Sequence, residues 1–64
     1  MTNGAAIIEA FGGMTRAARA IGVPVTTVQH WRNRDRIPAW RERDVIEAAQ
    51  ANGIDLPVTG YDAA

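Results

Sequence analysis

The chain has 64 residues with no Cys and one His, which bounds it to one small domain and excludes disulfides and zinc sites with sulfur ligands. Its apolar fraction of 47% is typical of a globular chain, and twelve of these residues are Ala, which favours helices because Ala loses no rotamer entropy in them. The net charge is zero, but residues 14–43 hold all seven Arg and a net charge of +5, whereas residues 44–64 carry −4. This asymmetry indicates a face for a polyanion, with a solvated surface paired to the acidic end as the alternative.

Glycines and prolines divide the chain into four blocks that favour helices. The first block spans residues 3–11, with Thr2 or Asn3 as its cap and Gly12 as a left-handed stop. Its predicted apolar face consists of Ala6, Ile7, Ala10 and Phe11. The second block, residues 14–21, spaces Met14, Ala17, Ala18 and Ile21 as one helical face and leaves Arg16 and Arg19 on the polar side.

The third block spans residues 24–33 and starts with Pro24, at or near the first helical position. The fourth block starts at Pro38 and stops at Gly53. Beyond it, residues 54–64 are expected to be a short flexible tail rather than a packing strand. The sequence therefore predicts an all-α fold, with a compact four-helix domain over residues 1–53.

The second and third blocks are separated by a very short break at Gly22-Val23. A turn this tight needs a residue that tolerates positive φ, which Gly does. Ala18 offers a small contact between the two helices, Val23 fills the corner, and Val28 and Trp31 turn inwards. A small residue, followed by a Gly and then by apolar residues at helical spacing, is the steric pattern of a helix-turn-helix.

The opposite face of the third block is polar and free of acidic residues. At ~100° per residue, Thr26, Gln29, His30 and Asn33 share one sector of the helix. Gln can bind adenine through two hydrogen bonds, His can donate to guanine, and Thr26 or the neighbouring Val25 can contact a thymine methyl. This face is therefore suited to the major groove of DNA.

Residues 11–49, FGGMTRAARAIGVPVTTVQHWRNRDRIPAWRERDVIEAA, resemble the helix-turn-helix of Cro/CI-type phage repressors and of related small prophage and antitoxin-like regulators. The shared features are a helix started by Gly-Gly, an Ala…Gly-Val turn, Trp31 near the end of the recognition helix, a basic loop and the Ile37-Pro38-Ala39 sequel. The chain departs from the family at Pro24-Val25, where many relatives have a Ser or Thr cap and a polar base-reading residue.

The resemblance implies residue roles in a complex with double-stranded DNA. The residues implied to read bases are Val25, Thr26, Gln29 and His30. The residues implied to contact phosphates are Thr15, Arg16, Thr27, Arg32, Asn33, Arg34 and Arg36.

Other interpretations of individual residues stay open at this stage. His30 fits an ordinary surface residue as well as a base reader, and Arg34 and Arg36 fit a solvated loop as well as phosphate contacts. Trp40 can cover the core or face a partner subunit. Arg41 and Arg43 can pair along their helix with Glu47 and its neighbours.

We expect a sequence-specific regulator, most simply a phage or prophage-type repressor that binds a palindromic operator as a homodimer. Trp40, the fourth helix and the tail are the candidate dimer interfaces. An excisionase-like architectural factor and an antitoxin or antirepressor that binds a protein are the alternatives. Neither a cofactor nor a metal nor an enzymatic activity is expected, because no phosphate loop, metal cluster or paired catalytic residues occur. With no apolar run of 18 residues and no secretory start, the expected location is the bacterial cytoplasm or nucleoid.

Overall fold

The computed structural model describes residues 1–56, which form four α-helices and one short 3-10 helix. The elements in chain order are α1 (Gly4–Ala10), α2 (Met14–Ile21), α3 (Val25–Arg34), the 3-10 helix η1 (Ala39–Arg41) and α4 (Glu42–Ala51). Extended pairing within residues 1–56 is limited to one isolated antiparallel bridge between Thr2 and Arg36. The prediction of an all-α, four-helix fold is confirmed.

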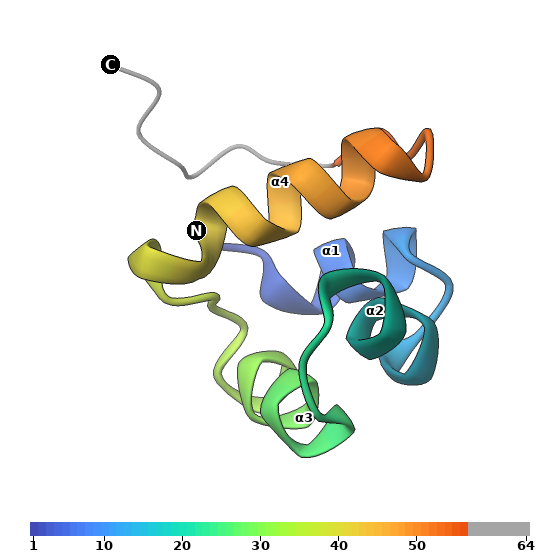
Figure 1. Ribbon diagram of the computed structural model, residues 1–64. Helices are drawn as coiled ribbons and strands as arrows, with labels where there is room; N and C mark the ends of the chain where they lie inside the picture. The colour runs from blue at the N-terminus through green and yellow to red at the C-terminus, as the bar shows by residue number, and fades with distance from the viewer. Residues whose placement is uncertain (57–64) are drawn as a thin grey trace.

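The helices are arranged so that α3 and α4 lie on opposite sides of α1 and α2 (Figure 1). The backbone of α3 packs against α1 and α2, that of α4 packs against α2, and α3 and α4 make no close backbone contact with each other. The chain passes from α3 to α4 along one flank of the molecule, and η1 lies on that flank (Figure 1). One side of the molecule is thus formed by α3 alone.

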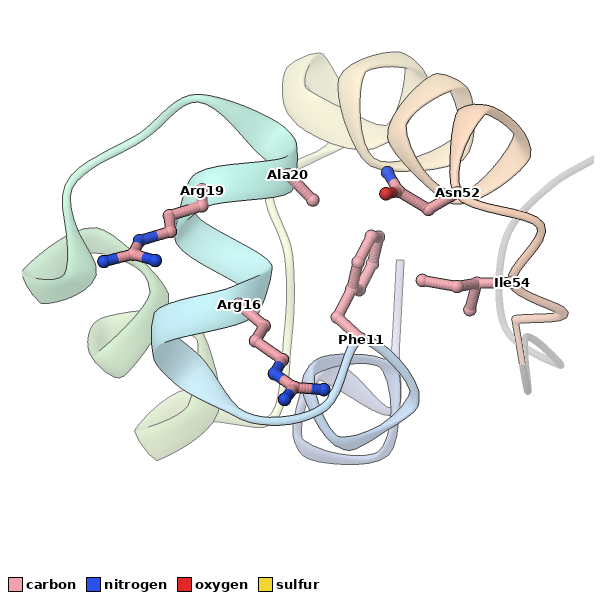
Figure 2. A pocket seen from close by; sticks show the side chains of 6 residues that line it. All are labelled: Phe11, Arg16, Arg19, Ala20, Asn52 and Ile54. Carbon is pink, nitrogen blue, oxygen red and sulfur yellow. The ribbon is translucent and has the colours of Figure 1, made fainter.

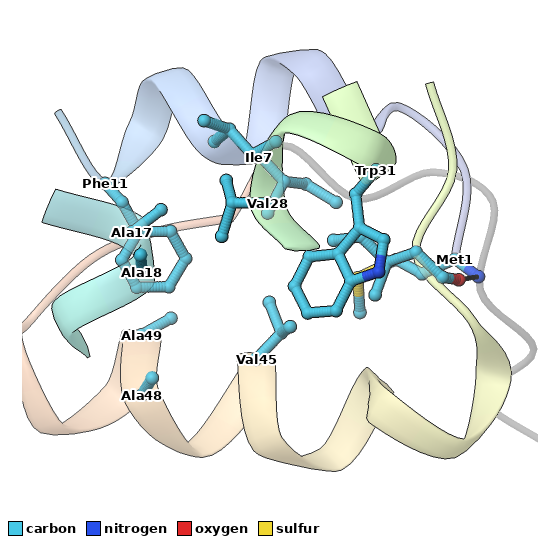
Figure 3. Packing of buried hydrophobic residues seen from close by; sticks show 12 residues of the cluster. Met1, Ile7, Phe11, Ala17, Ala18, Val28, Trp31, Val45, Ala48 and Ala49 are labelled. Atoms are coloured by element: carbon cyan, nitrogen blue, oxygen red, sulfur yellow. Dashed lines mark hydrogen bonds between the residues drawn. The ribbon is translucent and has the colours of Figure 1, made fainter. Parts of the chain in front are cut away.

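A single apolar core joins the helices. Val28 and Trp31 enter it from α3, and Val45 enters it from α4 (Figure 3). Ala17 and Ala18 are buried on α2, as the spacing of that block predicts, and their small side chains let the neighbouring helices come close. The core therefore fixes which face of α3 points inwards.

The buried face of α1 differs from the predicted one. Ile8 is buried, whereas Ala6, which was assigned to the apolar face, is exposed. Gly4, Ile7, Ile8 and Phe11 are the buried positions, and they follow the i, i+3, i+4, i+7 spacing of one helical face. The difference arises because the larger Ile8 gains more from burial than Ala6.

The helix boundaries lie close to those predicted from the glycines and prolines. Residues Met14–Ile21 form α2 as predicted, and Pro24 is the N-cap of α3, next to the first helical position, so that α3 spans Val25–Arg34. Residues 39–41 after Pro38 form η1 before α4 begins. Ile54 and Leu56, at the start of the expected tail, are half-buried against the core, and Asp55 between them is exposed. Residues 57–64 of that tail lie outside the described residues.

The first residue contributes to the core in a way that the sequence did not indicate. The Met1 side chain is buried, and its ammonium group donates to the Ile37 carbonyl at 3.0 Å and to Glu42 Oε2 at 2.9 Å. The Ile37 N–H donates back to the Met1 carbonyl at 2.9 Å. These bonds hold the connection between α3 and η1 against the start of the chain.

Candidate nucleic-acid interface

The break between α2 and α3 is built by three consecutive residues. Gly22 has φ of +86°, and both it and Val23 donate their N–H groups to the Ala18 carbonyl, at 2.8 and 3.1 Å. Pro24 is extended, with ψ of 149°, and its carbonyl accepts from the N–H of Thr27 at 3.0 Å. The chain therefore stops one helix and starts the next across three residues, as the sequence predicts for a helix-turn-helix.

The outward face of α3 holds the side chains predicted to read bases. Thr26, Gln29 and His30 are exposed, and Val25 is 42% exposed at the start of the helix. Val28 and Trp31 are buried on the other side of the same helix. Because buried and exposed positions are separated in this way, α3 presents hydrogen-bonding groups to solvent from a rigid support.

The residues predicted to contact phosphates lie on α2, on α3 and directly after α3. All of them are exposed except Thr27, which is half-buried; the exposed ones are Thr15, Arg16, Arg32, Asn33, Arg34 and Arg36. Within residues 1–56 the ion pairs involve Glu42 with the N-terminus and Asp44 with Arg41. The four arginines of this set therefore have no carboxylate partner in the part of the chain that the structure describes.

The one acidic residue in the basic loop is engaged elsewhere. Asp35 stands between Arg34 and Arg36 in a left-handed conformation, with φ of +54°. Its Oδ1 accepts the N–H of Ala5 at 3.0 Å, so the carboxylate caps the start of α1. Asn3 holds the N-cap position that the sequence predicted, but the acceptor for Ala5 comes from Asp35, 30 residues further along the chain.

Gly4 makes this junction between α1 and α3 possible. A Cβ at Gly4 would lie 2.8 Å from the Arg36 nitrogen and 3.0 Å from the Trp31 carbonyl oxygen. These two atoms are themselves hydrogen-bonded at 3.1 Å, so neither can move without breaking the end of α3. The close approach therefore fixes where the Arg34–Arg36 loop begins, and a hollow of about 470 Å³ forms beside it, lined by Thr2, Asn3, Arg34, Asp35 and Arg36.

A second hollow lies on the other flank, between α2 and the end of α4. It has a volume of about 460 Å³ and is lined by Phe11, Arg16, Arg19, Ala20, Asn52 and Ile54. Figure 2 shows Phe11 at its centre, with Arg16 and Arg19 both on the α2 side and Asn52 and Ile54 on the opposite side. Two cationic side chains make this flank basic.

Trp40 lies on η1 and is 73% exposed. The interpretation that it covers the core is therefore wrong, and the interpretation that it faces a partner subunit stays a prediction. The guanidinium of Arg41 lies 4.4 Å from the centre of its ring, and Nη1 of Arg41 donates to Asp44 Oδ2 at 2.9 Å. The predicted pairing of Arg41 along its helix is thus made with Asp44, a neighbour of Glu47.

Comparison of the chain with protein-family models, with curated proteins and with solved structures gives no match. Among residues 1–56, no three His, Asp or Glu side chains come together as metal ligands. The helices of this part of the chain are also too short and too polar to cross a membrane.

Proposed function

We propose that this chain is a sequence-specific DNA-binding regulator, of the kind that the resemblance to Cro/CI-type repressors implies. The observation that carries the proposal is the division of α3 into a buried anchor, Val28 and Trp31, and an exposed face without acidic residues. A helix with its side chains is about 10–12 Å across and the major groove of B-DNA is about 12 Å wide, so such a face fits the groove.

Base recognition is assigned to four side chains of α3. Gln29 offers one donor and one acceptor, which match the edge of adenine, and His30 donates to guanine. Val25 and Thr26 lie in the first turn of α3, and we assign to them contacts with thymine methyl groups. Specificity then depends on few residues, so each one has a large effect on sequence discrimination.

Phosphate binding is assigned to the arginines around α3. Arg32, Arg34 and Arg36 are exposed, and the carboxylate of Asp35 among them is directed to α1. Guanidinium groups bind phosphate oxygens through two parallel hydrogen bonds. These contacts fix the register of the protein on the duplex and carry no sequence information.

One short helix reads only a few base pairs, so we propose that two copies act together on a palindromic operator. The half-sites are then about 34 Å apart, one turn of DNA. Occupancy of the operator in the bacterial cytoplasm blocks or biases transcription by the polymerase. An excisionase-like factor would bend the duplex instead, and a protein-binding antitoxin would leave DNA unbound.

Selection of bound sequences from a random duplex library tests the proposal directly. The expected result is a palindromic consensus with two half-sites one helical turn apart. Recovery of no consensus, with equal affinity for all duplexes, would remove the repressor proposal, and a strong bend in the bound duplex would favour the architectural alternative.

Variants of the basic loop test the phosphate assignment. Arg34→Ala should weaken binding to selected and scrambled duplexes alike and reduce the slope of log affinity against log salt by about 1. Arg43→Ala is the matched control, because Arg43 is an exposed arginine on α4, on the far side from α3. Equal effects of the two substitutions would contradict the assignment.

A further inference from the structure

The largest exposed apolar side chain in residues 1–56 is Trp40, and base and phosphate recognition do not use it. Val25, the other large apolar side chain that is exposed, lies on the reading face of α3. Trp40 lies on η1, on the flank of the molecule, with 73% of its surface in solvent. Exposed Trp is costly in water and is enriched at the centres of protein interfaces.

Two charged side chains, those of Arg41 and Asp44, lie beside Trp40. Arg41 stacks over the ring at 4.4 Å, and Asp44 fixes the Arg41 guanidinium through a 2.9 Å ion pair. Each copy of the chain thus presents an apolar ring beside one cation and one anion. Because the patch holds one group of each sign, a two-fold contact can pair the Arg41 of one copy with the Asp44 of the other and the reverse.

The positions of the other faces favour this flank for a DNA-binding dimer. A contact through the outer face of α4 would direct the two α3 helices to opposite sides, because α3 and α4 lie on opposite sides of the molecule (Figure 1). A two-fold contact through the α2 flank would bring Arg16 and Arg19 of both copies together, with repulsion between like charges. The η1 flank allows both α3 helices to face one duplex. The connection that carries Arg36 also runs along this flank, but Asp44 supplies a carboxylate there, which the lining of the α2 hollow lacks.

We propose that the patch formed by Trp40, Arg41 and Asp44 is the interface with a second copy of this chain; the choice of partner rests on the proposed function. The principal extents of the chain are 30, 25 and 18 Å. Two copies joined at a flank therefore have centres at most about one molecular length apart, 30 Å or less, which is somewhat shorter than the roughly 34 Å between half-sites.

The area of the patch determines how tightly we expect two copies of the chain to bind each other. A standard interface buries about 800 Å² on each partner, which is roughly a fifth of the 4176 Å² that this chain exposes. Trp40 alone supplies about 150–250 Å² of that area. The dimer is therefore weak when free and forms more completely on an operator, where both copies are bound side by side.

Sedimentation velocity of the wild-type protein and of Trp40→Ala over a concentration series tests the interface. The expected result is a reversible monomer–dimer equilibrium in the wild type and an increase of the dimer Kd by tenfold or more in Trp40→Ala, with unchanged helical circular dichroism. Gln50→Ala, an exposed change on the outer face of α4, should leave the equilibrium unchanged. A wild type that stays monomeric at millimolar concentration, or a Trp40→Ala protein that dimerises as well as the wild type, would overturn the proposal.

Binding to a duplex with a single half-site separates this inference from the proposed function. Trp40→Ala should bind a single half-site as tightly as the wild type and lose only the cooperative gain on a double site. A loss of affinity for the single half-site would overturn the interface in favour of a direct contact between Trp40 and DNA. Dimerisation through Trp40 without any DNA binding would refute the proposed function and leave the interface standing.

Discussion

Replacement of Gly4 by Ala is a sharp test of the packing that supports the candidate interface. Ala is the better helix former by up to about 1 kcal/mol, so helix propensity alone predicts a more stable protein. The structure predicts the opposite, because the added methyl would meet the Arg36 nitrogen at 2.8 Å and the Trp31 oxygen at 3.0 Å. Both atoms belong to the backbone at the end of α3.

The loss of stability in Gly4→Ala can be estimated from the contacts between α1 and α3 that the added methyl group disturbs. Insertion of a methyl group into a packed site costs about 1–3 kcal/mol. If α1 withdraws from α3, the bond from Ala5 N–H to Asp35 Oδ1 is lost as well, at about 0.5–1.5 kcal/mol for an exposed bond. After a gain of about 1 kcal/mol in helix propensity is subtracted, the free energy of unfolding falls by about 0.5–3.5 kcal/mol. In a domain of this size, each kcal/mol lowers the Tm by about 4–8 °C.

Thermal and urea unfolding, followed by circular dichroism, measure this change. Ala6→Gly is the control, because Ala6 is exposed on the same helix and reports the effect of helix propensity alone, a loss of about 1 kcal/mol. A Gly4→Ala protein that is as stable as the wild type, or more so, would show that the contact between α1 and the end of α3 is not tight and would refute the reasoning.

Three further changes test other parts of the account. Asp35→Ala should lower the free energy of unfolding by about 1–3 kcal/mol, because it removes the acceptor for Ala5 and places Ala at φ of +54°; Asp35→Asn keeps an acceptor and tolerates this φ, so urea titration should place it within about 0.5 kcal/mol of the wild type. Gly22→Ala faces open space at φ of +86°, so calorimetry should show only the backbone strain of about 1–2 kcal/mol, and a larger loss would indicate an unseen contact. Ile7→Ala removes a fully buried side chain and should lower the free energy of unfolding, measured by urea titration, by about 2–5 kcal/mol. A variant as stable as the wild type would contradict the observed core.

Local patterns predicted the helices well because their signals are local. Gly12, Gly22 and Gly53 all have positive φ; Gly22 directly follows α2, and Gly12 and Gly53 come two residues after the ends of α1 and α4. The spacing of Val28 and Trp31 fixed the inward side of α3, and with it the outward side that holds Gln29. Periodicity of 3.6 residues is sufficient for such assignments when large and small side chains are clearly separated.

Contacts between distant segments could not be predicted in the same way. Asp35 caps a helix that begins 31 positions earlier, and Met1 bonds to Ile37 and Glu42. Nothing in the local sequence distinguishes these residues from ordinary loop or terminal residues. The exposure of Trp40 was equally open, since an aromatic residue two positions after a proline fits a core position and a surface position alike.

The central claim is that the outward face of α3 reads DNA sequence, and a comparison of two glutamines tests it most directly. Gln29 and Gln50 are both exposed, one on α3 and the other on the outer side of α4. Fluorescence anisotropy should measure Kd for a selected and a scrambled duplex with each Gln→Ala variant. Gln29→Ala should lose about 1–3 kcal/mol of discrimination between the two duplexes, while Gln50→Ala retains all of it. Equal discrimination by both variants and the wild type would contradict the claim.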